Sequence, residues 1–206
     1  MRTREYIHPL TDDERGFIDV AIPYLCTASP GIDHLPVTHA RQLQNLVDTG
    51  HFMPVHGTRA EKFRNEFRGH VGVQYNEGVA YPLGGGEDHY ALTATYYGPA
   101  YMVVHMKGVL ESIIINSHTP IEEGRLHLRF AVSLKHDGNI DRTSQFVAQY
   151  IDNLRRGYLQ DVAIWENKVF RERPILCDGD GDIGALRRWY RQFYEPREPF
   201  ERQAAE

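Results

Sequence analysis

Between residues 142 and 167 the chain reads RTSQFVAQYIDNLRRGYLQDVAIWEN. Its apolar residues recur at intervals of three and four, which is the period of one face of an α-helix. These residues are Phe146, Val147, Tyr150, Ile151, Leu154, Tyr158, Val162 and Trp165. The pattern predicts one long amphipathic helix, and its apolar stripe must pack against another element of the fold.

The stretches before this helix are rich in Val, Ile, Tyr and Thr and are separated by turn residues, a pattern typical of strands. The expected strands are 68–76, 90–97, 100–106, 109–116 and 125–134. Short turns between consecutive strands favour antiparallel pairing. The order predicts an α+β, helix-grip (START-like) fold, in which a curved antiparallel sheet wraps around the long C-terminal helix and its concave face holds a ligand cavity.

The flanking segments set the expected domain limits. Residues 1–38 contain four prolines and are interpreted as an extended lead-in with one short helix near 12–20. Helical spacing predicts a helix over 40–50 that ends at a glycine, and a final helix over 182–194 that begins at an N-cap, Asp182. The catalytic domain is then expected at 39–195 and a tail at 196–206.

The composition excludes several classes of protein. The 206 residues carry a formal net charge of −5, and no basic stripe indicates a nucleic-acid partner. No apolar run is long enough to span a membrane. The charged start of the chain lacks the apolar core of a signal peptide, and there are only two cysteines, which favours the cytoplasm.

The most specific local pattern is QNLVDTGHFMPVHG, residues 44–57. Asp48 and His51 are three residues apart and share a helix face. Pro54 disfavours helix at the preceding residue and Gly57 permits a sharp turn, so the chain can bend and bring His56 beside His51. Two imidazoles that converge in this way are typical of a metal site.

A third ligand is expected from Asp161 on the long helix. This aspartate lies on the apolar stripe with Tyr158 and Trp165, where an unpaired carboxylate costs several kcal/mol unless a metal or a partner neutralises it. Two histidines and one carboxylate form a facial triad with open positions, the geometry of non-haem Fe(II) sites. Two alternatives remain: an ion pair of Asp161 with Arg129 or Arg188, and a hydrogen-bonded His51–His56 pair beside Asp48.

Residues 44–57 resemble the E-N-x-x-D-x-x-H-F-x-x-x-H-G motif of Rieske oxygenase α subunits, with Gln44 in place of the usual glutamate. Residues 160–168 (QDVAIWENK), Arg173-Pro174 and 186–194 (LRRWYRQFY) are similar to the end of the steroid branch of that family. This branch contains the 3-ketosteroid 9α-hydroxylase oxygenases and the Neverland-type cholesterol 7-desaturases. The resemblance extends from about residue 37 to residue 194.

The resemblance implies a role for each matching residue. His51, His56 and Asp161 match the ligands of a mononuclear Fe(II). Asp48 matches the aspartate that passes electrons from the Rieske cluster of a neighbouring subunit in a trimer. Asn45 matches an asparagine near the iron.

The chain departs from the family in one large respect. A Rieske cluster requires C-x-H and C-x2-H motifs, and neither Cys26 nor Cys177 lies in one, so no 2Fe-2S cluster is expected in this chain. Three explanations remain: a separate Rieske or ferredoxin protein supplies the electrons, the chain is a fragment, or its function has changed. The first is expected, with O2 and an apolar small molecule, a steroid among the candidates, as substrates. The assembly is expected to be a homotrimer or a hetero-oligomer.

Two further functions are compatible with the same residues. One is a metal-free, or vestigial, hydrophobic-ligand-binding module of the same fold. The other is a zinc-dependent hydrolase or isomerase that uses the same triad and requires no electron donor.

Overall fold

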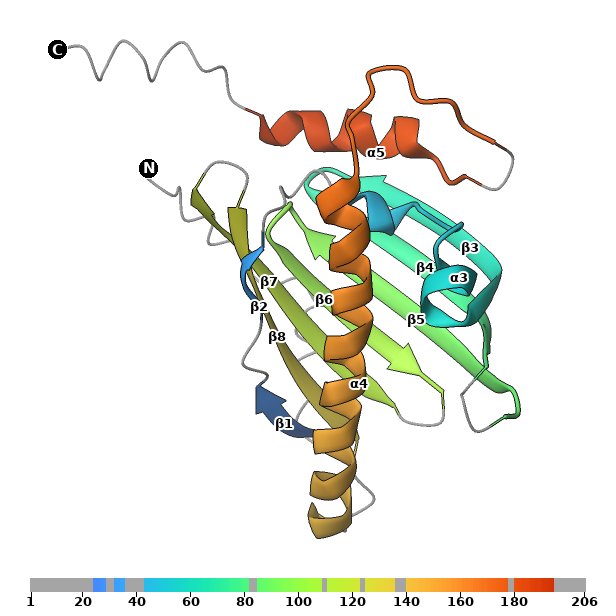
Figure 1. Cartoon of the computed structure of the whole chain (residues 1–206), viewed down its shortest axis with the longest axis vertical. Helices are drawn as coiled ribbons and strands as arrows, with labels where there is room; N and C mark the ends of the chain where they lie inside the picture. Colours follow the sequence, from blue (N-terminus) through green and yellow to red (C-terminus); the bar gives the residue numbers. More distant parts are fainter. Residues whose placement is uncertain are drawn as a thin grey trace, which may run out of the picture.

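The computed structural model describes residues 24–28, 32–35, 43–81, 85–108, 111–122, 125–135, 140–177 and 180–194. Within these residues, strands form one sheet and the long helix α4 (Ile140–Asn167) crosses one of its faces, as Figure 1 shows. The strands are β1 (Tyr24–Ala28), β2 (Ile32–Leu35), β3 (Thr58–Arg68), β4 (Val71–Ala80), β5 (Asp88–Tyr97), β6 (Tyr101–Lys107), β7 (Ser112–Glu122) and β8 (Arg125–Lys135). The other helices are η1 (Leu43–Leu46), α3 (Phe52–His56), α5 (Ile183–Tyr190) and η2 (Arg191–Phe193).

The sheet has eight strands in the order β1-β8-β7-β6-β5-β4-β3, with β2 also paired to β8. Each pairing is antiparallel, and β3 to β8 follow one another as a meander. Consecutive strands joined by short turns therefore give the antiparallel α+β architecture that the sequence predicts. No helix in the described part of the chain is long and apolar enough to cross a bilayer.

The core lies between the sheet and α4. Alternate residues of β5 to β8 point toward the helix and form a buried cluster that includes Ala94, Val104, Ile114 and Val132. Tyr150, Ile151, Leu154 and Tyr158 of α4 pack against this cluster. The apolar stripe predicted for the long helix is therefore the surface that α4 buries.

The prediction of a single strand over 68–76 was wrong. The chain turns at Gly69 and His70, so this region contains the end of β3, a tight turn and the first half of β4. Strand β3 is an edge strand, and most of its outward side chains are charged, among them Arg59, Glu61 and Arg64. Charged residues protect a sheet edge from unwanted pairing. The alternation by which a strand is recognised is interrupted by a β-bulge between Ala60 and Lys62 and by the polar inward residue Asn65.

The region before β3 differs from the prediction in two ways. Strands β1 and β2 lie inside the segment expected to be an extended lead-in, and both pair with β8. In the described part of the helix predicted over 40–50, only η1 is helical, and after it the Asp48 carboxylate accepts a hydrogen bond from the Gly50 N–H (3.2 Å), which favours a turn over further helix. The helix near 12–20 and the tail 196–206 lie outside the described residues.

The segment that leads into α5 packs tightly on the segment that carries Asp48. A Cβ built at Gly181 would lie 1.8 Å from the Val47 carbonyl oxygen, so only glycine fits this close approach. The next residue, Asp182, accepts a hydrogen bond from the Ala185 N–H (2.6 Å), which confirms it as the N-cap of α5. Trp189 of α5 then packs on Phe67 of β3, with ring centroids 5.5 Å apart.

We predict that Gly181→Ala lowers the free energy of unfolding by about 1–3 kcal/mol, because the added methyl group displaces the Val47 backbone. A glycine inside α4, Gly157, provides the matched control: its nearest neighbour to a built Cβ is 3.9 Å away. Gly157→Ala should stabilise the protein by up to about 1 kcal/mol through helix propensity. Urea unfolding of the three proteins measures both effects, and a Gly181→Ala variant as stable as the wild type would contradict the close approach.

Candidate metal centre

The two histidines of the 44–57 segment lie at either end of a short helix. His51 is the N-cap residue of α3 and His56 is its last residue. Gly57 then adopts a left-handed conformation (φ 62°) and its N–H donates to the Met53 carbonyl, which turns the chain into β3. The two imidazole rings stand edge to face with their centroids 5.2 Å apart.

Pro54 was expected to contribute to the bend together with Gly57, but it does not. Pro54 lies within α3 and the residue before it is helical. Proline is tolerated there because the first N–H groups of a helix have no partner inside the helix. The left-handed glycine alone ends the helix.

His51 is held in one orientation by the backbone. Its Nδ1 lies 2.8 Å from the main-chain carbonyl oxygen of Asp48, which can only accept a hydrogen bond. The ring therefore carries its proton on Nδ1 and leaves the lone pair of Nε2 for a ligand. His51 is 9% exposed and stacks on Phe52, with centroids 4.4 Å apart.

Asp161 of α4 faces His56. Its Oδ1 is 3.1 Å from His56 Nε2, but this contact lacks hydrogen-bond geometry, and the buried oxygen has no hydrogen-bond partner among the described residues. The aspartate is 7% exposed, as its place on the apolar stripe predicts. Two ligand atoms at right angles around one ion, each about 2.1 Å from it, are about 3 Å apart, which matches this separation.

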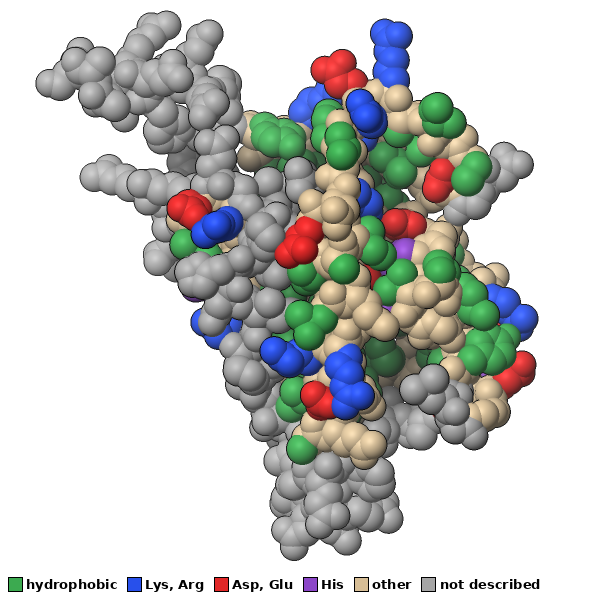
Figure 2. All heavy atoms as spheres, in the orientation of Figure 1, with side chains coloured by type: hydrophobic (Ala, Val, Ile, Leu, Met, Phe, Trp, Pro, Cys, Tyr) green, Lys and Arg blue, Asp and Glu red, His purple; other side chains and the backbone are tan. Residues whose placement is uncertain are grey.

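The structure thus brings His51, His56 and Asp161 together. Each offers one ligand atom, and these atoms lie within 4.8 Å of one another. Figure 2 shows histidine and acidic side chains meeting at the surface beside α4, on the side where α3 lies. The set suits a metal ion, since a buried carboxylate oxygen without a donor is costly unless a cation accompanies it.

Asp48 lies beside the triad and is not one of its members. Its Oδ1 is 3.7 Å from His51 Nδ1, and its Oδ2 is 3.5 Å from the Lys168 ammonium. Burial alone would raise the pKa of Asp48, but the His51 ring and Lys168 together lower it to about 2. Asp48 is therefore ionised at neutral pH while its side chain stays 26% exposed.

Asn45 is fixed by the same helix. The indole N–H of Trp165 donates to Asn45 Oδ1 across 3.0 Å. Asp161 and Trp165 are four residues apart and share one face of α4, and Lys168 follows directly after the last helical residue, Asn167. Each contacts a different residue of the 45–56 segment: His56, Asn45 and Asp48, respectively.

Three residues near the triad have no role predicted from the sequence: Lys168, Tyr96 and Asn116. The spacing of Lys168 from Asp161 could have identified it. Tyr96 is buried and Tyr158 is partly buried, and burial, followed for Tyr96 by the nearby charge of Asp161, raises the pKa of both phenols. The Tyr158 hydroxyl donates to Asn116 Oδ1 (2.8 Å). No local pattern reveals these partners, because they come from separate strands.

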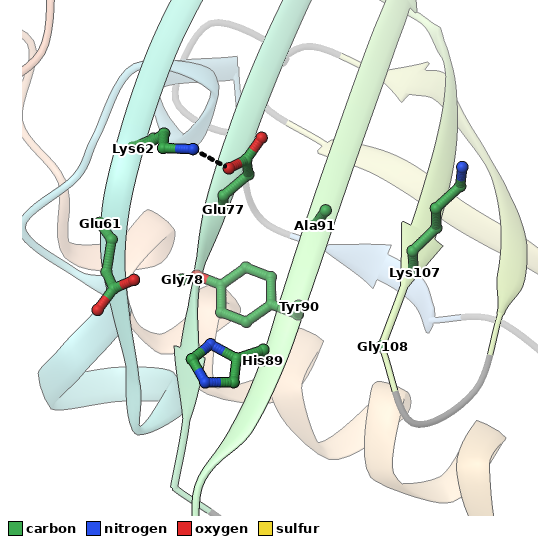
Figure 3. Close-up of a pocket in the computed structure, with 9 residues that line it drawn as sticks. All are labelled: Glu61, Lys62, Glu77, Gly78, His89, Tyr90, Ala91, Lys107 and Gly108. Carbon is green, nitrogen blue, oxygen red and sulfur yellow. Dashed lines mark hydrogen bonds and ion pairs between the residues drawn. The ribbon is translucent and has the colours of Figure 1, made fainter.

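A hollow lies on the outer face of the sheet, which points away from α4. Figure 3 shows it over β3 to β6, with Lys62 paired to Glu77 across 2.7 Å. Its lining residues are Glu61, Lys62, Glu77, Gly78, His89, Tyr90, Ala91, Lys107 and Gly108. Outward charges of both signs line it, and none of its residues belongs to the triad.

Residues 10–194 match the family model described as the 3-ketosteroid 9alpha-hydroxylase C-terminal domain. An oxygenase component of 3-ketosteroid-9-alpha-monooxygenase from Rhodococcus rhodochrous is 35% identical over 165 residues, which are 74% of this chain and 43% of the relative. The corresponding component from Mycobacterium tuberculosis is 33% identical, with the same shares covered. Cholesterol 7-desaturase nvd 1 of Ciona intestinalis is 31% identical over 50% of this chain and 21% of its own length.

Solved structures of Rieske-type oxygenases have the same fold. Dicamba monooxygenase bound to 3,6-dichlorosalicylic acid superposes with a TM-score of 0.65 at 14% identity, over 84% of this chain and 60% of that one. The NdmA QL mutant of Pseudomonas putida CBB5 with caffeine gives a TM-score of 0.56 at 12% identity, over 82% of this chain and 49% of that one. The chain spans less than half the length of the steroid oxygenase relatives named above. The family expected from residues 44–57 and 160–194 is confirmed, and the chain belongs to the 3-ketosteroid 9α-hydroxylase C-terminal domain family.

Proposed function

We propose that this chain is the catalytic domain of a mononuclear non-haem iron oxygenase that hydroxylates or desaturates an apolar, steroid-like substrate. The observation that carries the proposal is the convergence of His51, His56 and Asp161, with a buried Asp161 oxygen that no hydrogen bond satisfies. Two imidazoles and one carboxylate on one side of an ion leave its other positions open, the arrangement typical of Fe(II) oxygenases.

The residues present fit an Fe(II) ion. His51 and His56 would bind it through ring nitrogens and Asp161 through a carboxylate oxygen. Fe(II) held there supplies the redox chemistry that O2 activation requires. The chain's own residues orient the ligands: the Asp48 carbonyl fixes the His51 ring, and α4 holds Asp161 in a buried position.

Asp48 is the proposed entry point for electrons. Its carboxylate is ionised, partly exposed and adjacent to His51, so a donor protein can approach it from the surface. Lys168 and the Gly50 N–H hold the carboxylate in place, while Trp165 holds Asn45 nearby. The donor is proposed to be a separate Rieske protein, within a homotrimer or a hetero-oligomer, since the relatives are named as oxygenase components.

The substrate class rests on the relatives and on the inner face of the sheet. The relatives are named for 3-ketosteroids and for cholesterol. Between β3 and α4 the inner face presents apolar side chains, among them Phe63, Leu92 and Met106, which suit an apolar ligand. A helix-grip (START-like) class is proposed for the same reason, since the long helix packs across this face. The cytoplasmic location stays a prediction.

We expect the purified protein, loaded anaerobically with Fe(II), to hold about one iron per chain. His51→Ala and Asp161→Ala should both lose it, because each removes one of three ligands. Mass spectrometry of the metal after desalting measures the content. The matched control is His105→Ala: this histidine pairs with Glu111 on the outer face and should not affect iron binding.

The other outcomes distinguish the rival functions. Zinc at the same stoichiometry, retained in competition with Fe(II), would contradict the oxygenase function and favour a zinc-dependent hydrolase or isomerase. If the wild-type protein takes up no metal, the function that remains is that of a metal-free module that binds hydrophobic ligands.

The ion pair of Asp48 with Lys168 should make the free energy of unfolding depend on pH. A lowered carboxylate pKa contributes stability above the unfolded value of 3.8, and this contribution is lost as the pH falls toward about 2. In the metal-free protein, Lys168→Met should therefore cost about 0.5 kcal/mol at pH 7, and the cost should shrink as the pH approaches 2. Urea unfolding between pH 7 and pH 3 measures the difference.

Lys62→Met is the control for this effect, because Lys62 pairs with Glu77 on the outer face, away from the triad. It should leave the pKa of Asp48 unchanged, as followed by carboxyl NMR. A Lys168→Met protein whose Asp48 titrates like the wild type would show that the lysine does not hold this carboxylate.

A further inference from the structure

One buried side-chain amide on the inner face of the sheet lacks a hydrogen-bond partner for one of its atoms among the described residues. Asn76 in β4 is 1% exposed, although asparagine is seldom so deeply buried. It lies on the side of the strand that faces α4, in register with Phe63 of β3 and Leu92 of β5. Its neighbours in the cross-strand row are therefore apolar.

Only one of the two polar atoms of the Asn76 amide has a hydrogen-bond partner among the described residues. The Tyr90 hydroxyl donates to Asn76 Oδ1 across 3.3 Å, and Asn76 Nδ2 has no hydrogen-bond partner among the described residues. A phenol hydroxyl can donate or accept, so turning the amide over would satisfy Nδ2 and leave Oδ1 unpaired instead. In either orientation, one polar atom is left without a partner from the described residues.

The unpaired amide is connected to the metal centre by an apolar surface. Phe63, beside Asn76, lies against Phe52 with ring centroids 6.0 Å apart, and Phe52 stacks on His51. Phe63 and Leu92 remain partly exposed although the asparagine between them is buried. An apolar ligand placed on this surface would contact the triad at one end and the Asn76 amide at the other.

We propose that Asn76, oriented by Tyr90, is the polar anchor of the ligand site and binds an oxygen carried by an otherwise apolar molecule. With the amide held as observed, Nδ2 donates to a carbonyl oxygen, so the site prefers a ketone over the matching hydrocarbon. The inference rests on the proposed function for the location of the ligand, but it concerns recognition and not oxygen chemistry.

The test measures binding of two probes that differ by one oxygen, 5α-androstan-3-one and 5α-androstane, by anaerobic equilibrium dialysis against the whole chain. The wild type should bind the ketone about tenfold more tightly, the scale expected for one buried hydrogen bond. Asn76→Leu keeps the volume and removes the amide, so it should abolish this preference and leave binding of the hydrocarbon unchanged or stronger.

Two further variants complete the design. Glu77→Gln is the matched control: it is the next residue on β4 and points to the opposite face, where it pairs with Lys62 (Figure 3), so the ketone preference should stay intact. Tyr90→Phe removes the hydroxyl that orients the amide and should reduce the preference in part. This variant decides the matter if Asn76→Leu does not fold.

The proposal is overturned if the wild type binds both probes equally or neither, or if Asn76→Leu retains the ketone preference. An unchanged preference in Tyr90→Phe overturns it where Asn76→Leu cannot be prepared. The dialysis uses both the metal-free and the Fe(II)-loaded protein, with no electron donor. A ketone preference in a protein that binds no iron would therefore support the role of Asn76 in ligand binding and contradict the proposed oxygenase function.

Discussion

The contact between one face of α4 and the segment 45–56 is the constraint on which the centre depends. Asp161 meets His56, Trp165 donates to Asn45, and Lys168 pairs with Asp48. The helix holds Asp161 and Trp165 one turn apart, and Lys168 lies directly after its end, so the three side chains fix the position of the segment together. Packing of the helix on the sheet, through Tyr158, Val162 and Trp165, keeps this face in place.

Much of this arrangement could be predicted from the sequence, because the helix signal is strong. Asp161 was recognised as a buried carboxylate from its place between Tyr158 and Trp165, and the structure buries it. Strands β5 to β8 were recognised because their apolar alternation is clear. The strand β3 was not predicted because a β-bulge between Ala60 and Lys62 and the polar inward residue Asn65 interrupt its alternation. Pro54 was expected to share with Gly57 in the bend, but Gly57 makes it, after His56. Local patterns report which residues are buried, but they do not report which turn residue is decisive or which side chains pair across the sheet.

The two faces of the sheet have different chemistry. The outer face near β3 to β6 carries paired charges, such as Lys62 with Glu77, that are already compensated by one another. The inner face combines apolar side chains with a few buried amides and hydroxyls, including the Tyr158–Asn116 and Tyr90–Asn76 pairs. Polar groups that are few, buried and fixed are suited to orient an apolar molecule, because each can favour one placement of the ligand over others.

The partners along the α4 face are far apart in sequence: Trp165 and Asn45, like Lys168 and Asp48, are separated by 120 residues. Closing such a loop costs conformational entropy before any contact compensates it, so contacts of this kind form late in folding. During synthesis both histidines leave the ribosome before the strands of the meander, and the third ligand follows only after every strand of the meander has been made. An intermediate that lacks a docked α4 therefore has an incomplete centre, and retention of a metal reports completed folding and not local structure alone.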